Sequence, residues 1–397
     1  MRRRCLSLLV LLLAVLSVTA CIYDFTPVVE EAQSVVVIEG DILVGGYTDV
    51  RISESRPLET PFREMPVTGW PAGAAARVEA SDGTVYQGMG SRIDTRAADP
   101  GQQYRLVVSY RNRTYVSAWE SVVPAAAIDS ISYTVSSDHL SMTIDVTSHG
   151  NADNLYYRWT AREDWEYHTP YSASHYFVPA GSYDREGNYY KTPSVVPYKN
   201  GENSYYCWSS GRVAALLLAS AEALSENRIV RHDLYSISCY ERRISYIYSV
   251  ELTQLSLSET AYRYWENIQK NSGDVGGLFS PEPFDMRGNL SCEEDPDEWV
   301  VGYISASFPS VKRIFIDAER IGFPRISVED RAVYDLVPFS TVDVQWPRLY
   351  RSGYVPYAHT PMGEPNEFDW IDRRCVDCRV WGNGSKVKPD FWPNDHK

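Results

Sequence analysis

The pattern of apolar and polar positions divides the chain into an apolar leader and a long body with the period of β-strands. Residues 6–18 are apolar apart from two serines, and three arginines precede them. From about residue 34 onward, short runs rich in Val, Ile, Thr and Tyr alternate with polar residues and are separated by Gly, Pro, Asn and Asp. Such runs are typical of strands joined by turns. The pattern therefore predicts a mainly β protein.

The clearest strand pattern lies in residues 34–124. The run SVVVIEGDI is typical of a buried strand, and YTDVRISES alternates with a period of two. Asp82 and Gly83 separate two alternating runs, which predicts a hairpin with a type I′ turn, and we expect a second hairpin to turn near Asn112. Turns every 8–12 residues without a helical pattern predict a small β-sandwich of the immunoglobulin or transthyretin type.

The remainder of the chain, residues 125–397, predicts a second, larger β-rich domain with long loops. Strand-like runs such as LSMTIDVTS, NLYYRWTAREDWEYH and SYIYSVELTQLSL are separated by two less regular regions. Residues 168–204 are rich in Pro, Gly, Tyr and Asn, and residues 317–370 read as irregular with short elements. Long loops of this kind in a compact domain are often functional or disordered.

One helix stands out in the segment SLSETAYRYWENIQKN, at about residues 257–271. Ser256 and Glu259 have the spacing of a capping box at its start. The apolar residues of the segment fall on one stripe at helical spacing. The stripe predicts a face packed on the core, and a binding face is the alternative.

The N-terminus, which ends in LSVTACIYDF, predicts the destination of the protein. A positive start, a short apolar stretch and small residues before a cleavage point are the parts of a secretory signal, here residues 1–20. The apolar stretch is shorter than the roughly 20 residues of a membrane-spanning helix. Cys21, directly after Ala20, resembles the cysteine of a bacterial lipobox, which implies cleavage before it and acylation. An ordinary signal with an incidental cysteine is the alternative, and residues 21–33 would form the tether.

Charge and composition exclude nucleic acid as a partner. The chain has 38 basic and 52 acidic residues, a formal net charge of −14, and cleavage of the leader removes three arginines and no acid, which gives −17. Nucleic-acid binding needs clustered Lys and Arg against the phosphates. The 29 tyrosines suit half-buried strands, where the ring packs and the hydroxyl stays in water. An aromatic ligand-binding surface is the alternative explanation for them.

Five cysteines follow the lipobox, and an oxidising compartment favours disulfides among them. The motif CVDC can form a bridge, hold zinc or act in redox chemistry. Zinc needs a second pair of ligands, and a redox site needs a helix N-terminus in a βαβ setting; neither context is evident. The disulfide candidates are therefore Cys207, Cys239, Cys375 and Cys378. We expect a Cys207–Cys239 bridge, a second bridge through Cys375 or Cys378, and Cys292 as the one free thiol.

A search for catalytic motifs finds no nucleophile elbow, zinc-protease helix or phosphate loop. His168 and His175 share one loop, where a metal pair is the alternative to two solvated side chains. The acidic run CEEDPDE at 292–298 lacks the ligand spacing of a known calcium loop, so a solvated turn is favoured. The sequence thus predicts no enzyme, no metal site and no cofactor. Hydrolase carboxylates in loops 168–204 or 274–298 stay open, because separation in space defines such a pair.

The chain ends in KVKPDFW, two large aromatic residues after a proline. This ending predicts a terminal strand that docks Phe391 and Trp392 into the core. An exposed anchor for a partner is the alternative, since aromatic residues dominate interface energetics.

Several landmarks together resemble a known family. They are the lipobox with a short tether, VVVIEGDI, YYRWTAREDWEY, YYCWSS, LSLSETAYRYWENIQKNSGDVGGLFSPEP, GNLSCEEDPDEWVVGYISAS, VKRIFI and CVDCRVWGNGSKVKPDFW. In combination they resemble the Bacteroidota lipoproteins of domain-of-unknown-function family 4249, over nearly the whole mature chain. Cys292 departs from that family, which more often has a plain polar residue there.

The resemblance implies an outer-membrane lipoprotein, often paired with a TonB-dependent receptor, and it assigns no catalytic residue. We therefore expect a protein lipid-anchored to the bacterial outer membrane, on the cell surface or the periplasmic face. It would act without catalysis as an accessory or binding protein, with a TonB-dependent receptor in nutrient uptake. An envelope glycan or peptide hydrolase and a structural envelope protein are the alternatives.

Overall fold

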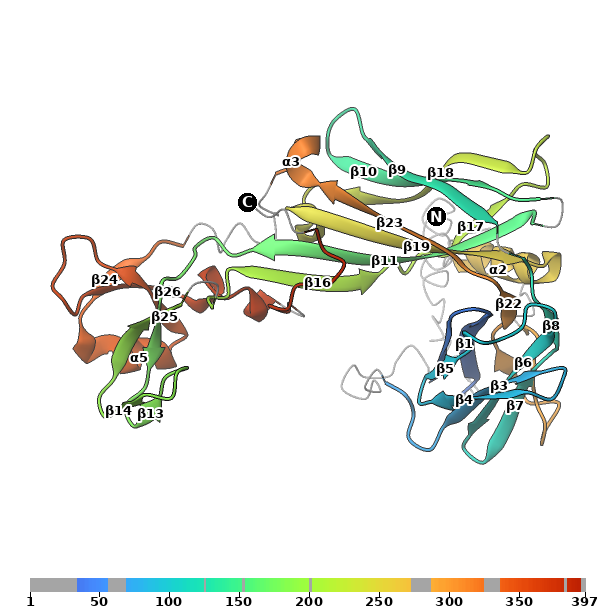
Figure 1. Ribbon diagram of the computed structural model, residues 1–397, viewed down its shortest axis with the longest axis horizontal. Coiled ribbons are helices and arrows are strands. Elements are labelled where there is room, and N and C mark those ends of the chain that lie inside the picture. Colours follow the sequence, from blue (N-terminus) through green and yellow to red (C-terminus); the bar gives the residue numbers. More distant parts are fainter. Residues whose placement is uncertain are drawn as a thin grey trace, which may run out of the picture.

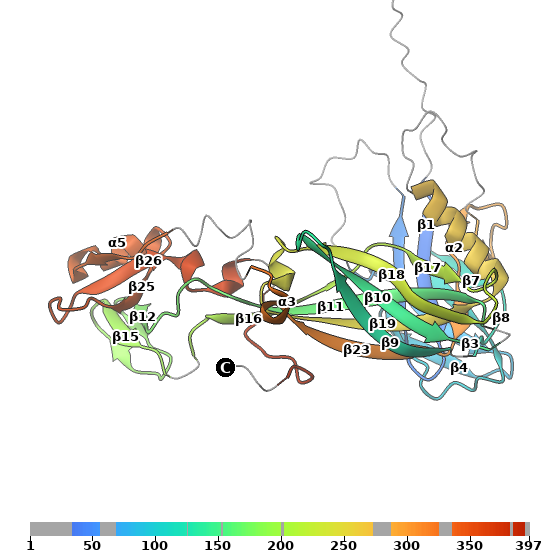
Figure 2. The same cartoon turned by 90° about the horizontal axis from the view of Figure 1, so that it is seen from above.

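A computed structural model describes eight stretches of the chain: residues 34–55, 69–124, 126–151, 154–199, 202–272, 287–324, 336–381 and 384–393. The predicted signal peptide, Cys21 and the tether lie outside the described residues. The strands outnumber the helices throughout, so the predicted mainly β class is confirmed. Figures 1 and 2 show three parts, which we call the N-terminal sheet, the central sandwich and the distal lobe. The N-terminal sheet and the distal lobe lie at opposite ends of the long axis in both views.

The N-terminal sheet has the strand order β20-β7-β6-β3-β4-β5-β2-β1-β21, with β8 beside β6 and β22 beside β1. Its strands are β1 (Val36–Leu43), β2 (Tyr47–Glu54), β3 (Ala75–Ala80), β4 (Val85–Met89), β5 (Arg92–Asp94), β6 (Gln103–Tyr110), β7 (Arg113–Ser117), β8 (Glu120–Ser121), β20 (Leu290–Cys292), β21 (Val300–Val301) and β22 (Ser305–Ser307). The two end strands, β20 and β21, contact each other, so the sheet nearly closes on itself. The expected domain of residues 34–124 is therefore incomplete, because residues 290–307 supply three further strands of this sheet.

The two predicted hairpins are confirmed, but their turns differ from the prediction. Asp82 and Gly83 join β3 to β4, and only Gly83 has a positive φ, of 89°. A type I′ turn needs a positive φ at both central residues. That pattern is found instead between β6 and β7, where Arg111 and Asn112 have φ values of 50° and 60°.

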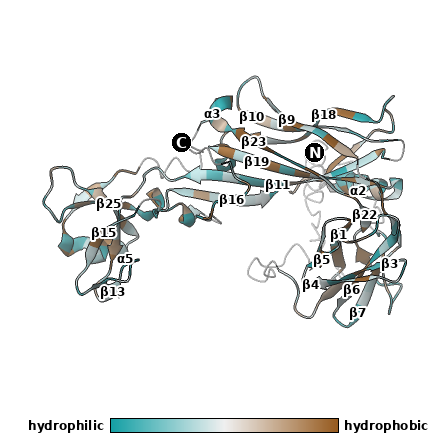
Figure 3. Ribbon diagram, viewed as in Figure 1, coloured by the Kyte–Doolittle hydropathy of each residue, from teal (hydrophilic) through white to brown (hydrophobic). Residues whose placement is uncertain are grey.

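The central sandwich consists of two sheets packed face to face. One sheet holds β9 (Ala127–Val135), β10 (Ser141–His149) and β18 (Arg228–Ser238); the other holds β11 (Tyr156–His168), β16 (Tyr206–Arg212), β17 (Leu217–Ser220), β19 (Ile247–Leu257) and β23 (Ser310–Asp317). Fully buried side chains from both sheets, among them Ile144, Trp159 and Val250, form one cluster. Figure 3 shows hydrophobic stretches along these strands. Burial of such side chains, each worth about 1.5–3 kcal/mol, holds the two sheets together.

Helix α2 (Glu259–Ser272) confirms the one strong helix prediction. Its apolar stripe packs with Tyr156, Leu218 and Tyr303 in a buried cluster, so the stripe is a core face, as predicted. The capping serine is Ser258 and not the predicted Ser256: the Ser258 hydroxyl oxygen accepts a hydrogen bond from the Ala261 amide at 3.3 Å. Two short helical pieces, η2 (Arg242–Ile244) and α3 (Ala318–Ile321), flank the sandwich. In the described part of the chain, no helix has the length and apolar character needed to span a membrane.

The distal lobe corrects the expectation of irregular loops. It combines two separate segments into β12 (His175–Val178), β13 (Ser182–Tyr183), β14 (Tyr189–Tyr190), β15 (Ser194–Pro197), β24 (Phe339–Thr341), η3 (Asp343–Gln345), α5 (Trp346–Arg351), β25 (Tyr354–His359), β26 (Phe368–Asp372), η4 (Arg373–Cys375) and η5 (Cys378–Trp381). Phe177 from the first segment packs with Trp346 and Trp370 from the second in a shared aromatic core. Strands β11 and β16 run out of the central sandwich toward this lobe (Figure 1).

Candidate functional site

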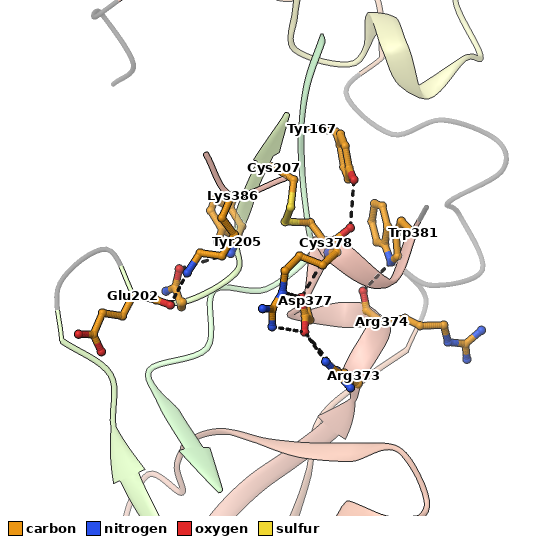
Figure 4. Close-up of polar contacts among 12 residues, drawn as sticks. Tyr167, Glu202, Tyr205, Cys207, Arg373, Arg374, Asp377, Cys378, Trp381 and Lys386 are labelled. Carbon is orange, nitrogen blue, oxygen red and sulfur yellow. Dashed lines mark hydrogen bonds and ion pairs between the residues drawn. A yellow bond between two sulfur atoms is a disulfide. The ribbon is translucent and has the colours of Figure 1, made fainter. Parts of the chain in front are cut away.

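A disulfide between Cys207 and Cys378 ties the distal lobe to the central sandwich (Figure 4). Cys207 lies on β16 and Cys378 opens η5, and both are fully buried. A bridge through Cys375 or Cys378 was expected, and the structure has one through Cys378. The predicted pairing of Cys207 with Cys239 is wrong. Cys239 lies at the end of the opposite sheet, in the core of the sandwich, and closeness in sequence does not place it near Cys207.

Among the described residues, the cysteines outside the disulfide are Cys239, Cys292 and Cys375, and all three are buried. Cys292 is unbridged, as predicted, but the expected count of one thiol becomes three. Burial raises the pKa of the Cys375 thiol to about 11. The thiolate is the reactive form of cysteine, so this environment disfavours redox chemistry at the CVDC motif. A structural bridge is the role that these contacts support.

Between the two cysteines of the motif, Asp377 organises a cluster of arginines. Its carboxylate accepts hydrogen bonds from Arg373 Nε and Nη2 at 3.1 and 3.0 Å, and from Arg379 Nε and Nη2 at 2.8 Å each. Figure 4 shows the carboxylate below the disulfide, with dashed lines to its guanidinium partners. Burial raises the pKa of Asp377, but the hydrogen bonds and charges of both guanidiniums outweigh it and leave the pKa below its usual value.

This cluster forms one wall of a hollow of about 300 Å³ between the two segments of the distal lobe. The first segment contributes β12, the turn between β13 and β14, and Tyr198 after β15; the second contributes α5, β25, η4 and η5. The lining combines tyrosine rings with three arginines, Arg185, Arg373 and Arg379. Ligand pockets start at about this volume and are mostly apolar with a few directed polar groups. The hollow is therefore the candidate binding site.

Arg185 lies on the other side of the hollow, stacked against two tyrosines. Its guanidinium carbon is 4.9 Å from the ring centre of Tyr176 and 4.7 Å from that of Tyr198. Its Nη1 donates to the carbonyl oxygen of Glu202 at 3.1 Å. Cation–π stacking and this hydrogen bond fix the plane of the guanidinium while the side chain stays exposed to solvent.

A fourth cation, Lys386, lies next to these arginines. Its Nζ donates to the Glu202 carbonyl oxygen at 2.5 Å, a contact drawn in Figure 4. Burial lowers the pKa of Lys386, and the nearby charges of Arg185 and Arg379 lower it further. Lys386 therefore lies beside two of the arginines that line the hollow, although the chain as a whole carries −14.

The histidines that the sequence singled out do not come together as a metal pair. His168 ends β11, where its Nε2 lies 2.5 Å from a buried Glu166 carboxylate oxygen and its ring stacks on Tyr246 at 3.7 Å. His175 is on β12, where burial and the nearby His359 lower its pKa. Among the described residues no cluster of His, Cys, Asp or Glu has the arrangement of a metal site.

The acidic run at 292–298 has structural contacts instead. Glu294 accepts a hydrogen bond from the Thr114 amide at 2.7 Å, and Glu298 pairs with Arg113 and accepts from the Tyr115 hydroxyl at 3.1 Å. These contacts hold β20 against β7 and help to close the N-terminal sheet. In the other loop proposed for hydrolase carboxylates, Asp184 accepts the amides of Glu186 and Asn188 at 2.8 Å each. Glu294, Glu298 and Asp184 thus have structural contacts within the fold.

The aromatic C-terminus docks as predicted, but in a turn rather than a strand. Trp392 is 2% exposed, and its indole N–H donates to Glu166 Oε2 at 3.1 Å. Phe391 is 40% exposed and lies against the guanidinium of Arg313, 3.9 Å from its carbon. The core position predicted for the pair therefore holds for Trp392 alone.

One polar residue that lines the hollow, His175, was singled out in the sequence, but as a possible metal ligand; the three arginines and Asp377 were not predicted. In the CVDC motif the prediction rested on the two cysteines and not on Asp377 between them. The pattern RRCVDCR holds a signal, since an acid flanked by arginines two and four residues away can pair with both inside a short helical turn. Arg185 carries no such signal, because its tyrosine partners lie nine residues before it and thirteen after it.

Comparison with known families gives the classification of this mainly β protein. The family described as "Domain of unknown function (DUF4249)" matches residues 22–313. The match covers well over half of the chain, and the chain belongs to this family. No curated protein matches the chain. The matched range includes Arg185 but ends before the segment of Arg373, Asp377 and Arg379, so only one side of the hollow lies within it.

The arginine cluster predicts a specific dependence of stability on pH. The pKa of Asp377 is lower in the folded protein than its usual 3.8, so its contribution is present above about pH 4 and is lost as pH falls through the folded-state pKa. We expect Asp377→Asn to lower the free energy of unfolding by about 2 kcal/mol at pH 7, because two guanidiniums lose a charged acceptor. Urea unfolding at pH 7, 5 and 3 measures this. The difference between wild type and variant should persist at pH 5 and shrink at pH 3; a constant difference would contradict the ion-pair explanation.

Proposed function

We propose that this protein is a lipid-anchored, non-enzymatic accessory protein of the bacterial outer membrane that binds a ligand for a TonB-dependent receptor. The hollow in the distal lobe is the observation that carries this proposal. It lies at the end of the molecule opposite to the N-terminal sheet, whose β1 begins the described part of the chain (Figure 2). A tether that leads into β1 would hold the N-terminal sheet near the membrane and present the hollow away from it.

The rigid connection between the two ends supports this arrangement. Strand β11 is 13 residues long and passes from α2 and the sandwich core to the distal lobe, and the disulfide locks the returning segment to β16. At about 3.3 Å per residue such a strand spans roughly 40 Å. A spacer of this kind is suited to holding a binding site at a fixed distance from an anchor.

The anchor itself gives the first prediction from this proposal. Cys21→Ser should move the protein from the membrane fraction to the soluble fraction, since acylation of Cys21 would be the source of membrane affinity. Fractionation followed by immunoblotting measures the distribution, and Cys292→Ser, which leaves the lipobox intact, is the matched control. A Cys21→Ser protein that stayed with the membranes would contradict the lipid anchor.

The partner is tested by affinity purification of the tagged, lipidated protein from native outer membranes in a gentle detergent. The proposal predicts a TonB-dependent receptor in stoichiometric amount by mass spectrometry. The Cys21→Ser protein, added to the same solubilised membranes, is the control for capture that does not depend on the anchor. Recovery of the lipidated protein alone would contradict the accessory role.

A further inference from the structure

We propose that the hollow in the distal lobe binds a small carboxylate-bearing ligand, with Arg185, Arg373 and Arg379 as the anion-binding side chains and tyrosine rings against the ligand's apolar face. This inference rests on the proposed binding function and adds the chemical class of the ligand. It follows from the number of oriented N–H donors in the hollow, from the charge around them and from the size of the space.

Arg185 provides donors that its own protein contacts do not use. A guanidinium has five N–H donors, and in the described part of the chain only Nη1 of Arg185 has a hydrogen bond, to the Glu202 carbonyl oxygen. Arg185 forms no ion pair with a described carboxylate, and it lies exposed on the wall of the hollow. Its contact with the neighbouring rings of Tyr176 and Tyr198 holds the guanidinium in place. A flat fork of this kind matches the two oxygens of a carboxylate.

Arg373 and Arg379 add further donors on the opposite wall. Each uses Nε and Nη2 for Asp377, which leaves Nη1 of both side chains without a hydrogen-bond partner among the described residues. Their side chains are 52% and 46% exposed, so solvent reaches them. Two carboxylates, Asp377 and Asp184, line the hollow with the three arginines, so the lining keeps an excess of one positive charge. Asp377 is a positioning residue here, since its carboxylate is taken up by Arg373 and Arg379 and orients them.

The aromatic part of the lining favours an organic anion over a bare ion. Tyr176 and Tyr198 lie 4.9 Å apart between their ring centres, and Phe177, Tyr183 and Tyr350 also line the hollow. Inorganic phosphate has no surface to place against these rings. A sugar ring or an aromatic ring with a carboxylate has both a charged end and a face that packs on tyrosine. The volume of about 300 Å³ is at the small end of the range for ligand sites and suits a single ring.

Isothermal titration calorimetry on the mature full chain tests the proposal with four probes. Galacturonate carries the carboxylate on a sugar ring, and benzoate carries it on an aromatic ring. Galactose is the neutral counterpart of galacturonate, and inorganic phosphate is an anion without a ring that could pack on tyrosine. We expect binding of at least one carboxylate with a Kd below about 10 mM, and at least tenfold weaker binding of galactose and phosphate. The carboxylate that binds more tightly shows whether the hollow prefers a sugar acid or an aromatic acid.

Two variants connect the binding to the hollow. Arg185→Gln removes the charge at an exposed position and should weaken carboxylate binding at least tenfold. Arg51→Gln removes another exposed charge, from the N-terminal sheet, where Arg51 pairs with Glu39 at 3.7 Å, and should leave the affinity unchanged. Carboxylate affinity should also fall as salt rises, because the attraction is electrostatic.

The proposal is overturned if neither carboxylate binds, if phosphate binds as tightly as the carboxylates, or if Arg185→Gln and Arg51→Gln have the same affinity. These outcomes are separate from failure of the proposed function. A receptor recovered from membranes together with a hollow that ignores carboxylates would reject the ligand class and keep the accessory role. Carboxylate binding without recovery of a receptor would keep the ligand class and reject the accessory role.

Discussion

Removal of the Cys207–Cys378 bridge should lower the free energy of unfolding by about 5 kcal/mol. The bridge joins residues that are 171 positions apart, and closing a loop of that length removes more entropy from the unfolded chain than closing a short one. Native contacts should amplify the loss: the Tyr167 hydroxyl donates to the Cys378 carbonyl oxygen at 3.1 Å, and the Cys378 amide donates to the Ser204 carbonyl oxygen at 3.0 Å. Denaturant unfolding of the Cys207→Ala/Cys378→Ala double variant measures the effect.

Cys375→Ala is the matched control, because Cys375 is equally buried and lies in the same segment but outside the bridge. It should cost about 1–2 kcal/mol from lost packing alone. Reduction of the wild-type protein should reproduce the double variant. A double variant as stable as wild type, or titration of five thiols in the denatured, unreduced mature protein with acylated Cys21, would contradict the bridge.

The second large effect is expected where the N-terminal sheet meets the central sandwich. Asp41 on β1 forms an ion pair with Arg158 on β11, and the guanidinium of Arg158 lies 4.7 Å from the ring centre of Trp265 on α2. The side chains are 15% and 6% exposed, and burial raises the pKa of Asp41 in spite of Arg158. Arg158→Met would leave the carboxylate buried without its cation. We expect a loss of about 3–5 kcal/mol in the free energy of unfolding, measured by urea denaturation.

Two further variants separate this ion pair from general packing. Asp41→Leu/Arg158→Met replaces both charges by apolar side chains and should restore most of the stability, since Asp41 Oδ1 and Arg158 Nε have no hydrogen-bond partner among the described residues even in wild type. Arg162→Met on the same strand removes a half-exposed arginine, 3.4 Å from Asp164, and should cost less than about 1 kcal/mol. Equal losses for Arg158→Met and the double variant would contradict a penalty from the unpaired charge.

Local pattern in the sequence predicted the elements whose stability is local. Helix α2 has a continuous apolar stripe and a capping serine, and the β3–β4 hairpin has Asp82-Gly83 between alternating runs. These features act between residues close in sequence, so they can be recognised without the fold. The position of the cap and the type of turn depend on single backbone angles, and the predictions of both were wrong.

Pairings between distant segments were beyond the same reasoning. Strands β20, β21 and β22 are two or three residues long and carry no recognisable alternation, yet they close a sheet that begins some 250 residues earlier. The sequence predicts mostly irregular structure for the distal lobe, because its elements are short and come from two segments. Its aromatic core of Phe177, Trp346 and Trp370 exists only once these segments meet.

The candidate site illustrates the same limit. Asp377 and its two arginines are close in sequence and could have been recognised from the order of charges around CVDC. The hollow arises when Arg185, from the loop that the sequence left irregular, is brought opposite this cluster. Its chemistry therefore belongs to the tertiary fold rather than to a motif.

The proposal that the hollow of the distal lobe presents a ligand to a TonB-dependent receptor is tested most directly by photo-crosslinking in intact cells. A photoreactive residue at Tyr183, which is 68% exposed on β13 of the distal lobe, is compared with one at Met89, which is 90% exposed on β4 of the N-terminal sheet. We predict a covalent adduct with a TonB-dependent receptor from position 183 and none from position 89. A receptor adduct from position 89 alone, or none from either position, would contradict the account.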